Sequence, residues 1–142
     1  MNPHAILLPV FVQVALTFAL LLTLGPARVA AVKRGEVEIN DIALGQSAWP
    51  NRITQIGNNF NSQFQVPVLF YALVVLALVT AKVDLVLIAG AWAFVASRLL
   101  HALVHVTTNR IAHRFNAFAI GVFVLAAMWI WFGARIIAGV VL

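Results

Sequence analysis

The chain has 142 residues, of which 63% are hydrophobic and only 9% are charged, and its formal net charge at pH 7 is +5. This composition excludes an ordinary soluble domain and indicates an integral membrane protein, because the length allows four spanning helices of about 20 residues in one domain. We take residues 1–142 as that domain. Most basic residues lie at the ends of apolar runs or inside them, which argues against a nucleic-acid partner.

Four apolar runs predict the spanning helices in chain order. The first covers about residues 5–32, and its uncharged part, residues 5–24, lacks the cleavage site of a removable signal peptide. The second covers about residues 52–81 and has a polar first half and an apolar second half. The third and fourth cover about residues 83–107 and 110–141. We therefore predict an all-α bundle with up-down-up-down topology.

The connections and the basic residues predict the orientation. Residues 33–51, which include Gln46, form the one segment of soluble composition and hold three of the four acidic residues. Four spans place both termini at one end of the bundle and the first and third connections at the other. Seven of the nine basic residues lie at that second end: Arg28, Lys33, Arg34, Arg52, Arg98, Arg110 and Arg114. The positive-inside rule then predicts cytoplasmic connections and termini on the non-cytoplasmic side.

A polar stripe interrupts the third run. Arg98, His101, His105 and Asn109 are separated by three, four and four residues, so they project from one face of a helix at membrane depth. Ionisable residues in such a place usually indicate function. We expect this face to meet either a polar ligand or hydrogen-bonding partners on other helices.

The two histidines of the stripe also leave a metal or haem site open as an alternative. His101 and His105 have the spacing at which two imidazoles bind one ion, but a closed site needs about two further ligands. His113 or a neighbouring subunit would have to supply them. The chain has no cysteine, so any thiol chemistry must use a thiol that the substrate brings.

The second run carries amides on two adjoining stripes. Arg52, Gln55, Asn59 and Gln63 share about one quadrant of a helix, and Asn58, Asn61 and Gln65 lie beside them. Buried amides require partners, so they either lock helices together or line a wet cavity near the cytoplasmic surface. With the arginines, such a cavity would suit a small anionic molecule with peptide-like groups, held next to a lipophilic cosubstrate.

Two segments resemble one known family. They are residues 59–71, and residues 98–105 followed by Asn109, Arg110, Arg114 and Phe115. Both are similar to bacterial members of the membrane-associated proteins in eicosanoid and glutathione metabolism (MAPEG), which include microsomal glutathione transferases and the leukotriene-C and prostaglandin-E synthases.

This resemblance implies a homotrimer in the bacterial inner membrane, with glutathione bound between neighbouring subunits near the cytoplasmic face. It implies a glutathione-dependent transferase or peroxidase that acts on lipophilic electrophiles. Arg114 is the best match to the arginine that stabilises the glutathione thiolate, and Arg110 is a close rival. The predicted glutathione-binding residues are Arg52, Asn59, Asn61, Gln63, Gln65, Arg98, His101, His105 and Asn109.

The chain departs from the family pattern on the second helix. An acidic residue normally binds glutathione there, whereas this chain offers Gln63 or Gln65, and either Asn59 or Asn61 could occupy the family's asparagine position. Two tyrosines of the eukaryotic enzymes are histidines here. A non-catalytic membrane protein, which binds a small lipid-like ligand or acts as a partner in a membrane complex, is therefore the nearest alternative.

Overall fold

A computed structural model describes residues 2–45 and 48–141, so Gln46 of the first connection lies outside the described residues. The described part forms helices joined by short turns, with no strand in it. Its elements are η1 (Pro3–Ile6), α1 (Leu7–Lys33), α2 (Ile39–Ile42), α3 (Asn51–Ser62), α4 (Val66–Val79), α5 (Leu85–Val106) and α6 (Ile111–Val141).

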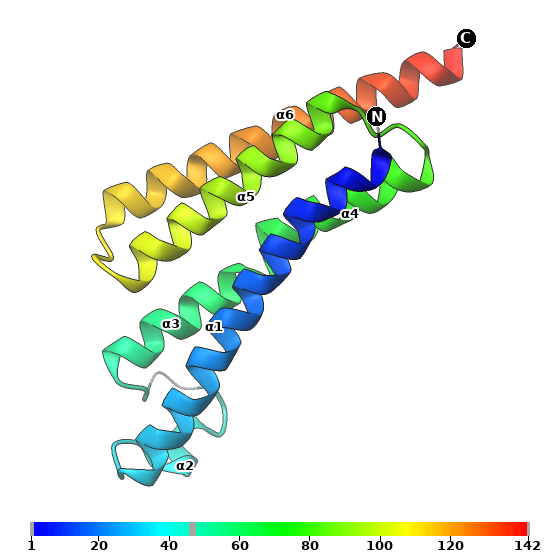
Figure 1. Cartoon of the computed structure of the whole chain (residues 1–142). Coiled ribbons are helices and arrows are strands. Elements are labelled where there is room, and N and C mark those ends of the chain that lie inside the picture. The colour runs from blue at the N-terminus through cyan, green and yellow to red at the C-terminus, as the bar shows by residue number, and fades with distance from the viewer. Residues whose placement is uncertain (1, 46–47, 142) are drawn as a thin grey trace.

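Four helical stretches are long and apolar enough to cross a membrane. They are Pro3–Lys33, Asn51–Val79, Leu85–Val106 and Ile111–Val140. Figure 1 shows that they alternate in direction, with both termini and the α4–α5 connection at one end of the bundle. We call this the terminal end; the loop end, opposite, carries α2 and the α5–α6 connection. The predicted all-α membrane bundle is confirmed.

The second span differs from the continuous helix predicted over residues 52–81. It consists of α3 and α4, which are separated at residues 63–65, where Gln65 adopts φ −99° and ψ −104°. Pro67 lies in the first turn of α4. Proline lacks the N–H that a helix needs and clashes with the carbonyl four residues earlier, here that of Gln63, which explains why the helix is interrupted at this point.

The apolar core occupies the terminal half of the bundle. Phe70 of α4 and Phe94 of α5 are fully buried, and their rings stack with centroids 4.8 Å apart. Helices α5 and α6 approach closely at a glycine, because a Cβ added at Gly121 would lie 2.5 Å from the Ser97 hydroxyl oxygen. Small residues at helix contacts are the usual means of close packing in membranes.

A polar contact closes this half at the terminal end. The Asp84 carboxylate accepts hydrogen bonds from the Leu87 backbone N–H at 2.9 Å and the Trp131 indole N–H at 2.8 Å, and it pairs with Arg135. Burial alone would raise the pKa of the Asp84 carboxyl, but these three partners together hold the pKa below its ordinary value. Asp84 thus caps α5 and ties it to α6.

Candidate functional site

The first turns of α3 lie against the end of α5 at the loop end. Arg52 donates to the backbone carbonyl of Val106, and the side-chain amide of Gln55 donates to the carbonyl of His105. The last carbonyls of a helix have no partner within it, so these two side chains satisfy groups that would otherwise be orphaned. Arg52, a predicted glutathione ligand, therefore caps α5 in the structure.

Further along α3 the same kind of contact continues into the bundle. The fully buried Asn59 donates to the carbonyl of Ala102 at 3.1 Å. One turn later Arg98 of α5, only 1% exposed, donates to the hydroxyl of Ser62 at 2.9 Å. We call these four contacts, made by Arg52, Gln55, Asn59 and Ser62 of α3, the α3–α5 ladder. It shows that much of the predicted polar stripe of the second span serves helix packing.

Buried amides also join α3 to α1. Gln13, which is fully buried in the first span, donates to the side-chain oxygen of Gln63 at 2.9 Å. Gln63 in turn donates to the side-chain oxygen of Asn59 at 3.2 Å. The two predicted ligands Asn59 and Gln63 therefore belong to one buried amide cluster that connects α1, α3 and α5.

The histidines of α5 face α6 beside Arg114. His101 and His105 are each 6% exposed, and a ring nitrogen of His101 lies 3.1 Å from the backbone carbonyl of Arg114. A cavity of about 220 Å³, here called the Arg114 cavity, is lined by His101, Arg114, Phe115 and Phe118 together with Ile111. It joins one cationic side chain to an apolar wall, which suits an anionic group next to a lipophilic one.

The turn between α5 and α6 holds the remaining predicted residues of this region. Asn109 adopts a positive φ of 47°, which asparagine tolerates better than most residues, and its N–H donates to the carbonyl of Val104 at 2.8 Å. Its side-chain oxygen accepts a hydrogen bond from the Arg114 guanidinium at 2.8 Å. Arg110, the rival of Arg114, is exposed on the same turn. Asn109 therefore orients Arg114 at the mouth of the cavity.

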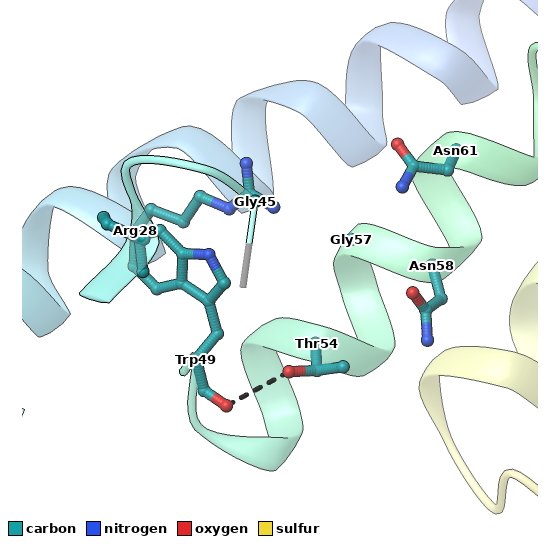
Figure 2. A pocket seen from close by; sticks show the side chains of 8 residues that line it. Arg28, Gly45, Trp49, Thr54, Gly57, Asn58 and Asn61 are labelled. Carbon is teal, nitrogen blue, oxygen red and sulfur yellow. Dashed lines mark hydrogen bonds between the residues drawn. The ribbon is translucent and has the colours of Figure 1, made fainter. Parts of the chain in front are cut away.

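A second polar cavity lies between α1 and α3 at the loop end. It has a volume of about 440 Å³ and is lined by Arg28, Trp49, Thr54, Asn58 and Asn61 among others. The Arg28 guanidinium lies 4.9 Å from the centre of the Trp49 ring, and Figure 2 shows Asn58 and Asn61 on the α3 wall of this cavity. We call it the Arg28 cavity.

The structure thus divides the predicted site residues among several places. His101, Asn109 and Arg114 come together, with His105 beside them. Asn61 belongs to the Arg28 cavity, and Gln65 is exposed in the break between α3 and α4. The others form the ladder and the buried amide cluster: Arg52, Asn59, Gln63 and Arg98.

Sequence reasoning did not single out Gln13, Arg28 or Ser62 as functional residues. The signal for Gln13 was present, because it is the one side-chain amide in the uncharged stretch of residues 5–24. Arg28 could be predicted to lie at the membrane surface, but its contact with Trp49 depends on the fold of the first connection. Ser62 has no distinguishing feature in the sequence.

Within one chain, the described structure brings no third ligand to His101 and His105. Within residues 2–45 and 48–141, no group of three or more histidine, aspartate and glutamate side chains is placed to hold a metal ion. The rings of His101 and His105 lie edge to face with centroids 5.6 Å apart, and a nitrogen of the first already faces the Arg114 carbonyl.

Comparison with sequence models of protein families identifies the family of this chain. The family model described as MAPEG family matches residues 6–134, which is nearly the whole sequence. The chain belongs to the MAPEG family. This family includes glutathione transferases and related membrane proteins. A comparison with curated proteins and a comparison with solved structures give no match.

Proposed function

We propose that this MAPEG protein is a glutathione-dependent transferase or peroxidase that acts on lipophilic electrophiles. The observation that carries the proposal is a set of arginines at the loop end that lack carboxylate partners. Among the described residues the ion pairs are Arg34–Glu36 and Arg135–Asp84. Neither pair includes Arg28 or Arg114, each of which lines a cavity, so these two cations favour an anion with carboxylates and peptide groups.

Arg114 is the residue we propose to act on the thiol of glutathione. A cysteine-type thiol has a pKa near 8.5, so a fixed cation beside it increases the fraction of thiolate at neutral pH. Arginine stays protonated and cannot accept the proton, which water must therefore take. The electrophile would enter along the apolar wall formed by Phe115 and Phe118. The thiolate sulfur would attack its electrophilic carbon and expel the leaving group as an anion. With a peroxide it would attack one oxygen and break the O–O bond, which releases an alcohol after protonation by water and leaves a glutathione sulfenic acid that a second glutathione reduces to the disulfide and water.

Two cavities support an assembly in which neighbouring subunits share the ligand. The Arg114 cavity lies between α5 and α6, whereas the Arg28 cavity lies between α1 and α3. We propose that one glutathione contacts the Arg114 cavity of one copy and the Arg28 cavity of its neighbour. We infer a homotrimer in the bacterial inner membrane, with the loop end in the cytoplasm and both termini on the other side.

Binding of glutathione to the purified protein in detergent tests the proposal directly. We expect Arg114→Met to weaken binding at least tenfold in calorimetry and to reduce the ultraviolet absorbance of bound thiolate. Lys33→Gln, which removes an exposed cation at the same end, is the matched control and should bind normally. Equal binding by the protein and the Arg114→Met variant, or no binding by a folded assembly, would refute the proposal.

The α3–α5 ladder favours a second candidate function, a non-catalytic membrane protein in which the polar residues only fix helix packing. On that hypothesis Arg114 and Asn109 would fasten the α5–α6 turn. Arg114→Ala should then disrupt assembly rather than ligand binding. Size-exclusion chromatography of the variant distinguishes the two functions, because the glutathione hypothesis predicts an unchanged oligomer.

A further inference from the structure

A groove follows the exposed side of α5 and α6 toward the terminal end, away from the proposed glutathione site. Its deeper part has a volume of about 520 Å³ and an apolar lining that includes Ala89, Ala93, Val124, Ala127 and Trp131. A second cavity of about 370 Å³ is lined by Trp131, Lys82, Arg135 and Gly139 among others. Since Trp131 lines both, we treat the two cavities as one surface, the α5–α6 groove.

Small residues on both helices leave room for the deeper part of the groove, which larger apolar side chains also line. Ala89 and Ala93 lie one turn apart on α5, and Val124, Ala127 and Trp131 follow the same spacing on α6. The alanines among them leave a channel on the surface of the two helices. Figure 1 shows that α5 and α6 run side by side. The channel is apolar along its length, so it suits a hydrocarbon chain.

The terminal part of the groove is cationic. Arg135 pairs with Asp84, but among the described residues no carboxylate forms an ion pair with Lys82. The Lys82 ammonium lies against the backbone of α6, where a Cβ added at Gly139 would be 2.9 Å from its nitrogen. Among the described residues, this end of the groove therefore holds two cationic groups and one carboxylate, which is an excess of one positive charge.

The order of these parts matches the depth of one membrane leaflet. Val124 and Trp131 are seven residues apart on α6, which corresponds to about 10 Å along the helix. One leaflet of hydrocarbon is about 15 Å thick. Tryptophan is favoured at the boundary between hydrocarbon and headgroups, so Lys82 and Arg135 lie at headgroup level and Val124 lies deeper.

We propose that the α5–α6 groove binds one anionic phospholipid from the leaflet at the terminal end. Its phosphate meets Lys82 and Arg135, and one acyl chain follows the apolar channel past Ala127. The charge excess selects an anionic headgroup, since each basic residue near a membrane surface attracts such lipids. This site is independent of the proposed glutathione function and lies at the opposite end of the bundle.

Native mass spectrometry of the purified protein in detergent tests the charge requirement. Phosphatidylglycerol and phosphatidylcholine with identical acyl chains are titrated separately. We expect tighter binding of phosphatidylglycerol and an affinity about fivefold lower in Lys82→Gln. Lys33→Gln, at the loop end, is the matched control and should keep the wild-type affinity. Equal affinity of the protein for the two lipids, or equal loss in both variants, would overturn the proposal.

A second pair of variants tests the channel without changing charge. Ala127→Leu fills the groove, whereas Ala126→Leu adds the same atoms on an exposed position of α6 outside it. We expect only Ala127→Leu to reduce the number of phosphatidylglycerol molecules retained. Because the chain has no cysteine, Ala127→Cys provides a single thiol. Efficient disulfide cross-linking between copies through this thiol would show that a second subunit covers the groove and would refute the lipid site.

Discussion

The two halves of the bundle hold their helices together by different means. Toward the loop end, α3 meets α5 through side chains that donate to backbone carbonyls or to a hydroxyl, as in the contacts of Asn59 and Arg98. In the terminal half, buried apolar side chains such as the stacked rings of Phe70 and Phe94 hold the helices together. Hydrocarbon offers no hydrogen-bond partners, so each buried polar side chain of the polar half must form hydrogen bonds with specific atoms of neighbouring helices. It is this half that holds the candidate site.

The largest expected effect concerns the apolar half. Phe94→Ala removes a fully buried ring that stacks on Phe70 and leaves a cavity, which should lower the free energy of unfolding by about 3 kcal/mol or more. Denaturant titration in mixed micelles measures this loss. Phe123→Ala removes a ring that is 76% exposed and serves as the control. Equal losses in both variants would contradict the assignment of the core.

A smaller loss should follow from crowding the α5–α6 contact. Gly121→Ala places a methyl group against the Ser97 hydroxyl, and such overpacking should cost about 2 kcal/mol. Gly133→Ala on the same helix meets no atom within 4 Å and should be neutral or stabilising. The same titration compares the two. If Gly121→Ala were as stable as Gly133→Ala, this would contradict the close approach of α5 and α6 at Gly121.

The polar half should respond more weakly to loss of one side chain. Asn59→Leu removes the hydrogen bond to the Ala102 carbonyl and the one accepted from Gln63. Side-chain hydrogen bonds in membranes contribute about 0.6 kcal/mol each, so loss of Asn59 should cost about 1 kcal/mol. Its exposed neighbour provides the control, because Asn58→Leu removes an amide that makes no ladder contact. A loss for Asn59→Leu as large as that for Phe94→Ala would show that the ladder, and not the apolar core, dominates stability.

The smallest effect should appear on acidification at the terminal end. Because the pKa of Asp84 is lowered in the folded chain, its contribution is fully present above the ordinary carboxyl pKa of 3.8 and is lost as the pH falls below that value. Thermal unfolding between pH 7 and pH 3 measures the loss. In Asp84→Asn the loss should be smaller, whereas the amide contacts of the ladder do not titrate. If the variant lost as much stability on acidification as the wild-type protein, Asp84 would not contribute to the pH dependence of stability.

Much of the fold could be predicted from hydrophobicity, but the division of the polar residues could not. The stripe on α5 predicts that Arg98 and His101 share one face, yet the first bonds to α3 and the second faces α6. Helical periodicity gives the angle of a side chain around its own axis, and it contains no information on which neighbouring helix lies there. For the same reason the sequence could not separate Asn59, in the bundle, from Asn61, in the Arg28 cavity.

By itself the sequence determined that the chain forms four membrane-spanning helices. The reason is that it contains four apolar runs long enough to cross the hydrocarbon layer and very few charged residues within them. It also determined that arginines gather at the end that carries the first and third connections. The tertiary structure alone decided which arginine caps a helix, as Arg52 does, and which opens onto a cavity, as Arg114 does. That choice depends on contacts between residues more than 50 positions apart in some cases, which no local pattern encodes.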